Sequence, residues 1–218
     1  MRKGCLALVV LALAAGGAWL AREPLLARVG GLVVEEGVLA PADVVVVLGD
    51  PPVLGAVDAA PLVVAGTVRR VLLLAAAPSE EARVLERVGL AQPRPHELAV
   101  DVLMRMRVPR DAIIVVPGGA AGTNAEVETV ARWAREHTAR RLIVITWRSH
   151  TRRVGILLRR RLGGDATVVM RAPGHDRFRP ERWWRERSSA REFAMEGLRW
   201  VNSLALGDLW AAAPAGSR

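Results

Sequence analysis

A histidine and several arginines stand directly behind one apolar run of the sequence. The run Leu142–Thr146 is typical of a buried strand, and Trp147–Arg153 follows it. If a helix begins at Ser149, then His150 and Arg153 share one face of its first turn, where the helix dipole disfavours cations. An arginine can hold a phosphate or carboxylate through two hydrogen bonds, and a histidine can transfer a proton. These residues predict an anion site; the alternative is a solvated, arginine-rich helix start.

A second candidate segment is the glycine-containing loop Pro117–Glu126. Gly118 and Gly119 allow backbone N–H groups to approach an anion, and a helix that begins at Thr123 or Asn124 adds positive potential there. No lysine followed by serine or threonine completes a nucleotide-binding P-loop. The segment therefore predicts either an anion-binding loop or an ordinary strand-to-helix turn.

The elements that must position these residues alternate along the chain. Short runs that are apolar on both faces suit a parallel sheet covered by helices. The runs are Asp43–Gly49, Arg70–Ala76, Ala112–Gly118, Leu142–Thr146 and Ala166–Arg171. Segments suited to helices are Ala59–Val68, Ser79–Val88, His96–Met106, Thr123–His137 and Ser149–Leu162. The pattern predicts an α/β fold: a Rossmann-like, doubly wound, mainly parallel five-stranded sheet with helices on both faces.

This fold class predicts where the candidate residues meet. In an open α/β sheet, ligands bind outside the carboxyl ends of the strands. Gly49 and Asp50 follow the first apolar run, and Thr146 ends the fourth. We expect them to line one pocket with the glycine loop and His150. A last helix within residues 188–206, with Ser189 and Glu192 in capping-box spacing, is expected to pack on the sheet or to rest on lipid.

The N-terminal segment is uncharged from Gly4 to Ala21 and follows Arg2 and Lys3. Its length suits a transmembrane helix, with a cleaved signal peptide or a buried helix as alternatives. The preceding charges place the N-terminus in the cytoplasm and the rest of the chain outside it. The domain organisation predicted is a membrane segment over 1–22, a linker over 23–40, an α/β domain over 41–210 and a tail over 211–218.

Composition narrows the partners. The formal net charge is +9, and Lys3 is the only lysine. A basic chain favours anionic partners. The single cysteine, Cys5, excludes an intramolecular disulfide, and no Cys/His spacing indicates a metal site. Nucleic acid is not an expected partner, because the arginines are spread without interleaved aromatic residues and the domain is expected outside the cytoplasm.

Four motifs together resemble the SanA/YdcF/ElyC-like family of bacterial envelope proteins. They are "ADVVVVLGD", a glutamate ahead of "MRVPRDAI", "TNAEV" and "ITWRSHTRR", in the family's order over roughly residues 42–170. The matched positions are Asp43, Gly49, Glu97, Thr123, Glu126, Thr146, His150 and Arg153. The chain departs from the family pattern after its first two strands, where Asp50–Pro52 and Ala75–Pro78 replace glycine-rich ends.

The resemblance implies a single-pass protein of the bacterial inner membrane whose soluble domain lies outside the cytoplasm. It implies a role in peptidoglycan or lipid-carrier metabolism or in barrier maintenance, and it identifies no cofactor. As an enzyme, the protein would act on an anionic small molecule or a phosphorylated, lipid-linked precursor. His150 would then be acid or base, Glu126 or Glu97 would orient it or activate water, and Arg153 would bind the anion. The alternative is a non-catalytic sensor or scaffold with a degenerate pocket.

Overall fold

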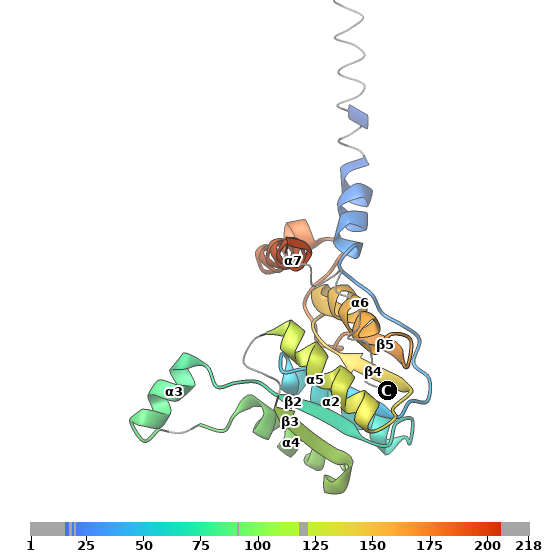
Figure 1. Cartoon of the computed structure of the whole chain (residues 1–218). Helices are drawn as coiled ribbons and strands as arrows, with labels where there is room; N and C mark the ends of the chain where they lie inside the picture. The colour runs from blue at the N-terminus through green and yellow to red at the C-terminus, as the bar shows by residue number, and fades with distance from the viewer. Residues whose placement is uncertain (1–15, 18, 20, 91, 118–121, 206–218) are drawn as a thin grey trace, which may run out of the picture.

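The sheet at the centre of the domain is parallel throughout, as Figure 1 shows. The computed structural model describes residues 16–17, 19, 21–90, 92–117 and 122–205. The strands are β1 (Val44–Val47), β2 (Val71–Ala75), β3 (Ile113–Pro117), β4 (Arg141–Ile145) and β5 (Thr167–Arg171). Their order is β3-β2-β1-β4-β5, which confirms the predicted Rossmann-like, parallel five-stranded sheet.

The central strand β1 explains why its residues form this sheet. Val45 pairs with Val71 of β2 on one side and with Ile143 of β4 on the other. The side chains of β1 are fully buried on both faces of the sheet. β-branched residues suit such a strand, because their side chains pack well on a pleated surface.

Helices cover both faces of the sheet. On one face, α5 (Thr123–Glu136) and α6 (Thr151–Leu162) pack against the residues of β1 that include Val44 and Val46. On the other face, α2 (Pro52–Val64) and α4 (Pro95–Arg105) pack against the residues that include Val45. The doubly wound arrangement with helices on both faces is therefore confirmed.

Two helices begin at residues other than those expected. The helix expected over Ala59–Val68 is α2, which begins at Pro52, because a proline suits the first turn of a helix. Asp58 is not its N-cap: the carboxylate accepts a hydrogen bond from the backbone N–H of Gly174 at 2.9 Å. The helix expected from Ser149 is divided into the 3₁₀ turn η2 (Arg148–His150) and α6.

The helix α3 (Glu80–Arg87) stands away from the domain body in Figure 1 and has no buried residue. The hydroxyl of Ser79 caps it by accepting a hydrogen bond from the N–H of Ala82 at 3.1 Å. A second 3₁₀ turn, η1 (Arg110–Ala112), leads into β3.

The last helix, α7 (Arg187–Ala205), packs on η2 and on the 3₁₀ turn η3 (Trp183–Arg185). Trp200 packs against the core cluster under α5 and α6. The expected capping box does not form, because the helix begins at Arg187 and the carboxylate of Glu192 accepts a hydrogen bond from Ser149 instead.

The N-terminal part of the described chain is tied to the domain. Residues 21–31 form a helix, and the indole N–H of Trp183 donates to the carbonyl of Leu26 at 2.8 Å. Farther along, within the segment interpreted as a linker, Glu35 N–H donates to the hydroxyl of Thr151 at 2.8 Å. The predicted membrane segment Gly4–Ala21 lies mostly outside the described residues, and no helix within them has the length and apolar character needed to cross a membrane.

Leu72→Ala tests the packing of the central sheet. Leu72 is fully buried in the core cluster of β1, α5 and α6. We expect the variant to lose about 2–5 kcal/mol of unfolding free energy, because truncation leaves a cavity. Chemical denaturation measures this loss, with the exposed Val88→Ala as the control, for which a change below about 0.5 kcal/mol is expected. Equal effects of the two substitutions would contradict the described core.

Candidate functional site

A cavity of about 500 Å³ opens at the carboxyl ends of the strands, where β1 and β4 lie side by side and the connections leave in opposite directions. It is lined by Gly49, Asp50, Ala76, Ala77, Gly122, Thr123, Glu126, Thr146, Trp147, Ser149, His150, Glu192 and Arg199. Six of the residues predicted from the sequence meet here: Gly49, Asp50, Thr123, Glu126, Thr146 and His150.

The hydrogen bond between His150 and Glu196 is the centre of the site. The Nδ1 atom of His150 lies 2.5 Å from Oε2 of Glu196, a side chain on α7 that is 0% exposed. The other carboxylate oxygen accepts a hydrogen bond from Nε of Arg153 at 2.7 Å. Arg199 lies 3.5 Å from the same carboxylate and is half exposed.

Electrostatics fixes the proton on the histidine ring. Burial raises the pKa of Glu196, but hydrogen bonds and charges from His150 and Arg153 outweigh burial and hold this pKa below its ordinary value. An ionised carboxylate only accepts hydrogen bonds, so Nδ1 of His150 must carry the proton. In the neutral imidazole with this tautomer, Nε2 carries the lone pair, and the Nη2 atom of Arg153 lies 2.8 Å from it.

The side chain that meets Nε2 at the cavity is Thr123, whose hydroxyl oxygen lies 3.3 Å away. Thr123 is the first residue of α5, while Gly122, with a φ of 82°, is the N-cap. No side chain caps this helix. The hydroxyl therefore faces His150, and glycine supplies the left-handed backbone that the turn requires.

The arginines of the opening segment hold protein groups. Arg153 is 5% exposed at its side chain and does not line the cavity; its guanidinium is bound to Glu196 and lies 2.8 Å from Nε2 of His150. Arg148 pairs with Glu36 at 3.7 Å, and Arg152 donates to the carbonyl of Val34 at 3.3 Å. The cations that crowd this part of the sequence thus bind a buried carboxylate and residues 34–36 of the chain.

Among the described residues that line the cavity, the arginine is Arg199 of α7. Its side chain is 52% exposed, so it can turn toward a bound anion more readily than the enclosed Arg153. In this structure, direct contact with an anion fits Arg199, while Arg153 fits the positioning of His150 and Glu196.

Two glutamates face the cavity from different elements. Glu126 of α5 accepts a hydrogen bond from the N–H of Gly49 at 2.9 Å, and a Cβ atom at Gly49 would lie 2.8 Å from the same carboxylate oxygen. A side chain at this position would therefore displace the carboxylate from the backbone N–H. Burial raises the pKa of Glu126. The hydrogen bond from Gly49 lowers this pKa by less than burial raises it, and the charge of Asp50 raises it further.

The second glutamate is Glu192 of α7, whose carboxylate accepts a hydrogen bond from the hydroxyl of Ser149 at 2.5 Å. Burial raises the pKa of Glu192 more than this hydrogen bond lowers it. Both glutamates are therefore more readily protonated than exposed ones, and a neutral carboxyl can donate a hydrogen bond to a ligand.

Some predicted residues lie elsewhere. Glu97 is exposed at the start of α4, where its carboxylate accepts a hydrogen bond from the N–H of Arg94 at 2.8 Å and closes a capping box. Asn124 is half-buried in the first turn of α5 and does not line the cavity. Gly118 and Gly119 lie outside the described residues.

Three residues of the site, Glu192, Glu196 and Arg199, were not identified from the sequence. All of them come from α7 and lie more than forty positions after His150 in the sequence. The signal was the spacing of Glu192 and Glu196, which are four residues apart and therefore share a helix face. That spacing alone is common on solvated helices and does not indicate a histidine partner.

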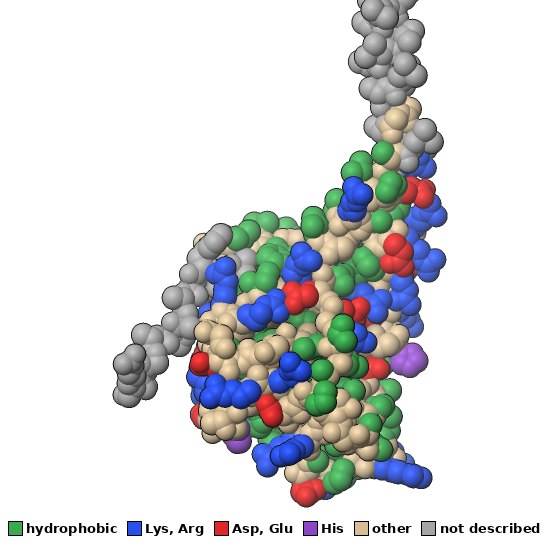
Figure 2. All heavy atoms as spheres, turned by 90° about the vertical axis from the view of Figure 1, so that its right-hand side faces the viewer, with side chains coloured by type: hydrophobic (Ala, Val, Ile, Leu, Met, Phe, Trp, Pro, Cys, Tyr) green, Lys and Arg blue, Asp and Glu red, His purple; other side chains and the backbone are tan. Residues whose placement is uncertain are grey.

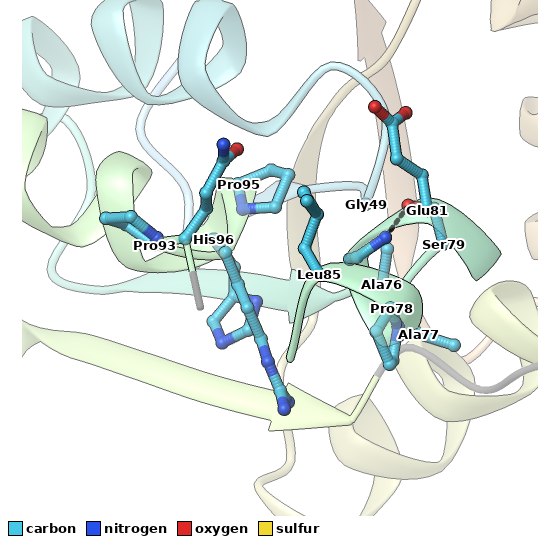
Figure 3. A pocket seen from close by; sticks show the side chains of 13 residues that line it. Gly49, Ala76, Ala77, Pro78, Ser79, Glu81, Leu85, Pro93, Pro95 and His96 are labelled. Atoms are coloured by element: carbon cyan, nitrogen blue, oxygen red, sulfur yellow. Dashed lines mark hydrogen bonds between the residues drawn. The ribbon is translucent and has the colours of Figure 1, made fainter. Parts of the chain in front are cut away.

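A second pocket, of about 310 Å³, adjoins the cavity, and Gly49, Ala76 and Ala77 line both. Figure 3 shows Leu85 of α3 and Pro95 at the start of α4 among its mainly apolar lining. Ala76 and Ala77 thus form the border between the polar cavity and an apolar pocket.

The arrangement can perform proton transfer with one base, His150, and two carboxyls of raised pKa. Within the described part of the chain, no group of three or more Cys, His, Asp or Glu side chains could hold a metal ion. No known protein-family model matches this chain, and no curated protein matches it.

Glu196→Ala tests the buried pair. The substitution leaves Arg153 buried without its carboxylate, so we expect a loss of about 3–5 kcal/mol of unfolding free energy, measured by chemical denaturation at neutral pH. The matched control is Glu128→Ala, which removes a partly exposed carboxylate paired with Arg135 and Arg161, with an expected loss below about 1 kcal/mol.

The stabilisation that Glu196 contributes to the fold depends on pH. Because the folded-state pKa of Glu196 is lowered, its stabilisation is present above the ordinary glutamate pKa, about 4.3, and is lost as pH falls through the folded-state value. The difference between wild type and Glu196→Ala should therefore shrink in acid. A difference independent of pH would contradict an ionised Glu196.

Proposed function

We propose that this protein is an enzyme that hydrolyses or transfers an anionic, phosphorylated group, with His150 as the general base. The observation that carries the proposal is the hydrogen bond from Nδ1 of His150 to the buried Glu196, which leaves Nε2 beside the hydroxyl of Thr123 at the cavity. A base oriented by a buried carboxylate is the arrangement that activates an oxygen nucleophile.

Nε2 of His150 accepts a proton from a water molecule that the Thr123 hydroxyl helps to position. The water oxygen forms a bond to phosphorus while the bond from phosphorus to the leaving oxygen breaks. Glu126, protonated through its raised pKa, donates a proton to the leaving oxygen. Solvent then returns the proton from His150 to Glu126.

Anion binding in this proposal falls to Arg199 and to the start of α5. Arg199 supplies a mobile positive charge at the cavity, and the uncapped N–H groups at Thr123 and beyond supply positive potential. The carboxyls of Asp50, Glu126 and Glu192 would repel an anion when ionised, so the raised pKa values of the two glutamates favour the bound state.

We propose further that the chain is a SanA/YdcF/ElyC-like protein anchored in the bacterial inner membrane by residues 1–22, with its domain outside the cytoplasm. Support comes from the matched motif positions Gly49, Thr123, Glu126, Thr146 and His150, which line one cavity. A lipid-linked or other phosphorylated precursor of the envelope is the substrate class that this location favours. Peptidoglycan or lipid-carrier metabolism, or barrier maintenance, is the proposed process.

The first functional prediction concerns catalysis. With p-nitrophenyl phosphate as the probe, we expect His150→Gln to lower kcat/KM by about 10²–10⁴-fold, since it removes the general base. Thr123→Val should cause a smaller loss and keep the fold, and half-buried His96→Gln is the matched control for a histidine outside the polar cavity. Release of p-nitrophenolate measures each rate, and circular dichroism checks folding.

The alternative function, a sensor or scaffold module without turnover, makes the opposite prediction. It is favoured by the departures from the family pattern after β1 and β2. In that case sulfate or phosphate binds wild type, no probe is hydrolysed, and His150→Gln retains binding. Hydrolysis that is unchanged in His150→Gln would exclude the proposed base.

The second functional prediction concerns anion binding and pH. We expect sulfate affinity, measured by calorimetry, to fall as pH rises above the ordinary glutamate range toward alkaline values, because Glu126 and Glu192, whose pKa values are raised by burial, then ionise. Arg199→Ala should weaken binding by about tenfold, and Arg191→Ala on the same helix is the control. Affinity that rises with pH would contradict neutral glutamates at the site.

A further inference from the structure

The helix α7 has two faces of opposite character. Its inner face carries Glu196 and Ser203, which are buried against the domain. Its outer side carries large apolar side chains that remain exposed: Met195, Leu198, Val201 and Leu204 are 45%, 62%, 62% and 44% exposed. Two positions along a helix turn by about 200°, so Leu198 points away from the side that holds Glu196.

The N-terminal end of the outer face is basic. Arg191 and Arg187 are exposed and lie about one and two turns before Met195, on the same side of the helix as Leu198. An apolar stripe with arginines on its rim is the composition of helices that lie in the interface of a bilayer and contact anionic headgroups. Most monomeric soluble domains do not leave such a stripe uncovered.

The position of α7 in the domain points to the same partner. The helix of residues 21–31 is fixed beside α7 by Trp183, which donates to Leu26 and stacks on Phe193 of α7 with ring centroids 4.0 Å apart. Leu25, on that helix, is 53% exposed. The uncharged run Gly4–Ala21 precedes this helix in the sequence.

The figures agree with this placement. In Figure 1, α7 lies at the end of the domain from which the N-terminal helix leaves. Figure 2 shows hydrophobic side chains at this end of the domain and elsewhere on the face, with arginine and acidic side chains among them. A bilayer that meets the N-terminal segment would therefore meet the outer face of α7.

We infer that the outer face of α7, formed by Met195, Leu198, Val201 and Leu204, docks on the surface of a bilayer that contains anionic lipids. Because Glu196 lies on the opposite side of this helix from Leu198, the pair of His150 and Glu196 is held about one helix diameter, roughly 10 Å, from the lipid surface. The membrane contact does not depend on catalysis at the cavity.

The test uses the full chain and a reporter on α7, because membrane binding by residues 1–22 alone would not reveal the position of this helix. In a Cys5→Ser background, Leu198→Cys is labelled with an environment-sensitive fluorophore. Val88→Cys is the matched control. The exposed fraction of Val88, 65%, is similar to that of Leu198, but Val88 lies at the end of α3 and not on α7. Val201→Cys provides a second reporter if circular dichroism shows that Leu198→Cys unfolds.

The probe is vesicles of phosphatidylglycerol and phosphatidylcholine that carry a spin-label quencher on the acyl chains. We expect several-fold stronger quenching at position 198 than at 88, a blue shift only when vesicles are present, and weaker quenching with phosphatidylcholine alone. Equal and weak quenching at the two positions would overturn the inference. A label at position 198 that is already shielded without vesicles would also overturn the inference. Shielding that depends on protein concentration would indicate a second copy of the chain, and shielding that does not would indicate the chain itself.

Discussion

The carboxylate of Glu196 is the group on which the site depends. It is fully buried, and a buried charge is tolerated only with partners that replace water. His150 and Arg153 supply those partners, and through them α7 is joined to η2 and α6. The same contacts orient the imidazole, keep its proton on Nδ1 and enclose one wall of the cavity. Structure and proposed chemistry therefore rest on one set of hydrogen bonds.

The parallel sheet provides the frame for this set. Since all five strands run the same way, the segments after β1, β2 and β4 and the start of α5 meet at one edge. The crevice lies beside β1 because the connections diverge there. Gly49 allows the carboxylate of Glu126 to approach the backbone, and burial of that carboxylate raises its pKa. The cavity thus combines a base with carboxyls that favour the protonated state.

Arginine has several distinct uses in this chain. Arg153 neutralises a buried carboxylate, Arg148 and Arg152 attach the N-terminal segment, and Arg199 remains half exposed at the cavity. Arg187 and Arg191 border the apolar face of α7. A formal charge of +9 therefore does not describe one cationic surface, because several of the arginines bind groups inside the domain.

Five strands, their parallel direction, the helices on both faces of the sheet and six residues of the cavity could be predicted from the sequence alone. Apolar runs such as that of β1 bury both faces, and such runs form parallel sheets whose carboxyl ends collect ligand residues. Only the tertiary structure decided the partners of those residues. Glu196 reaches His150 across 46 positions of sequence, and Arg153 turns from the cavity toward it. Helical spacing specifies which residues share a face, but it does not specify which distant element that face will contact.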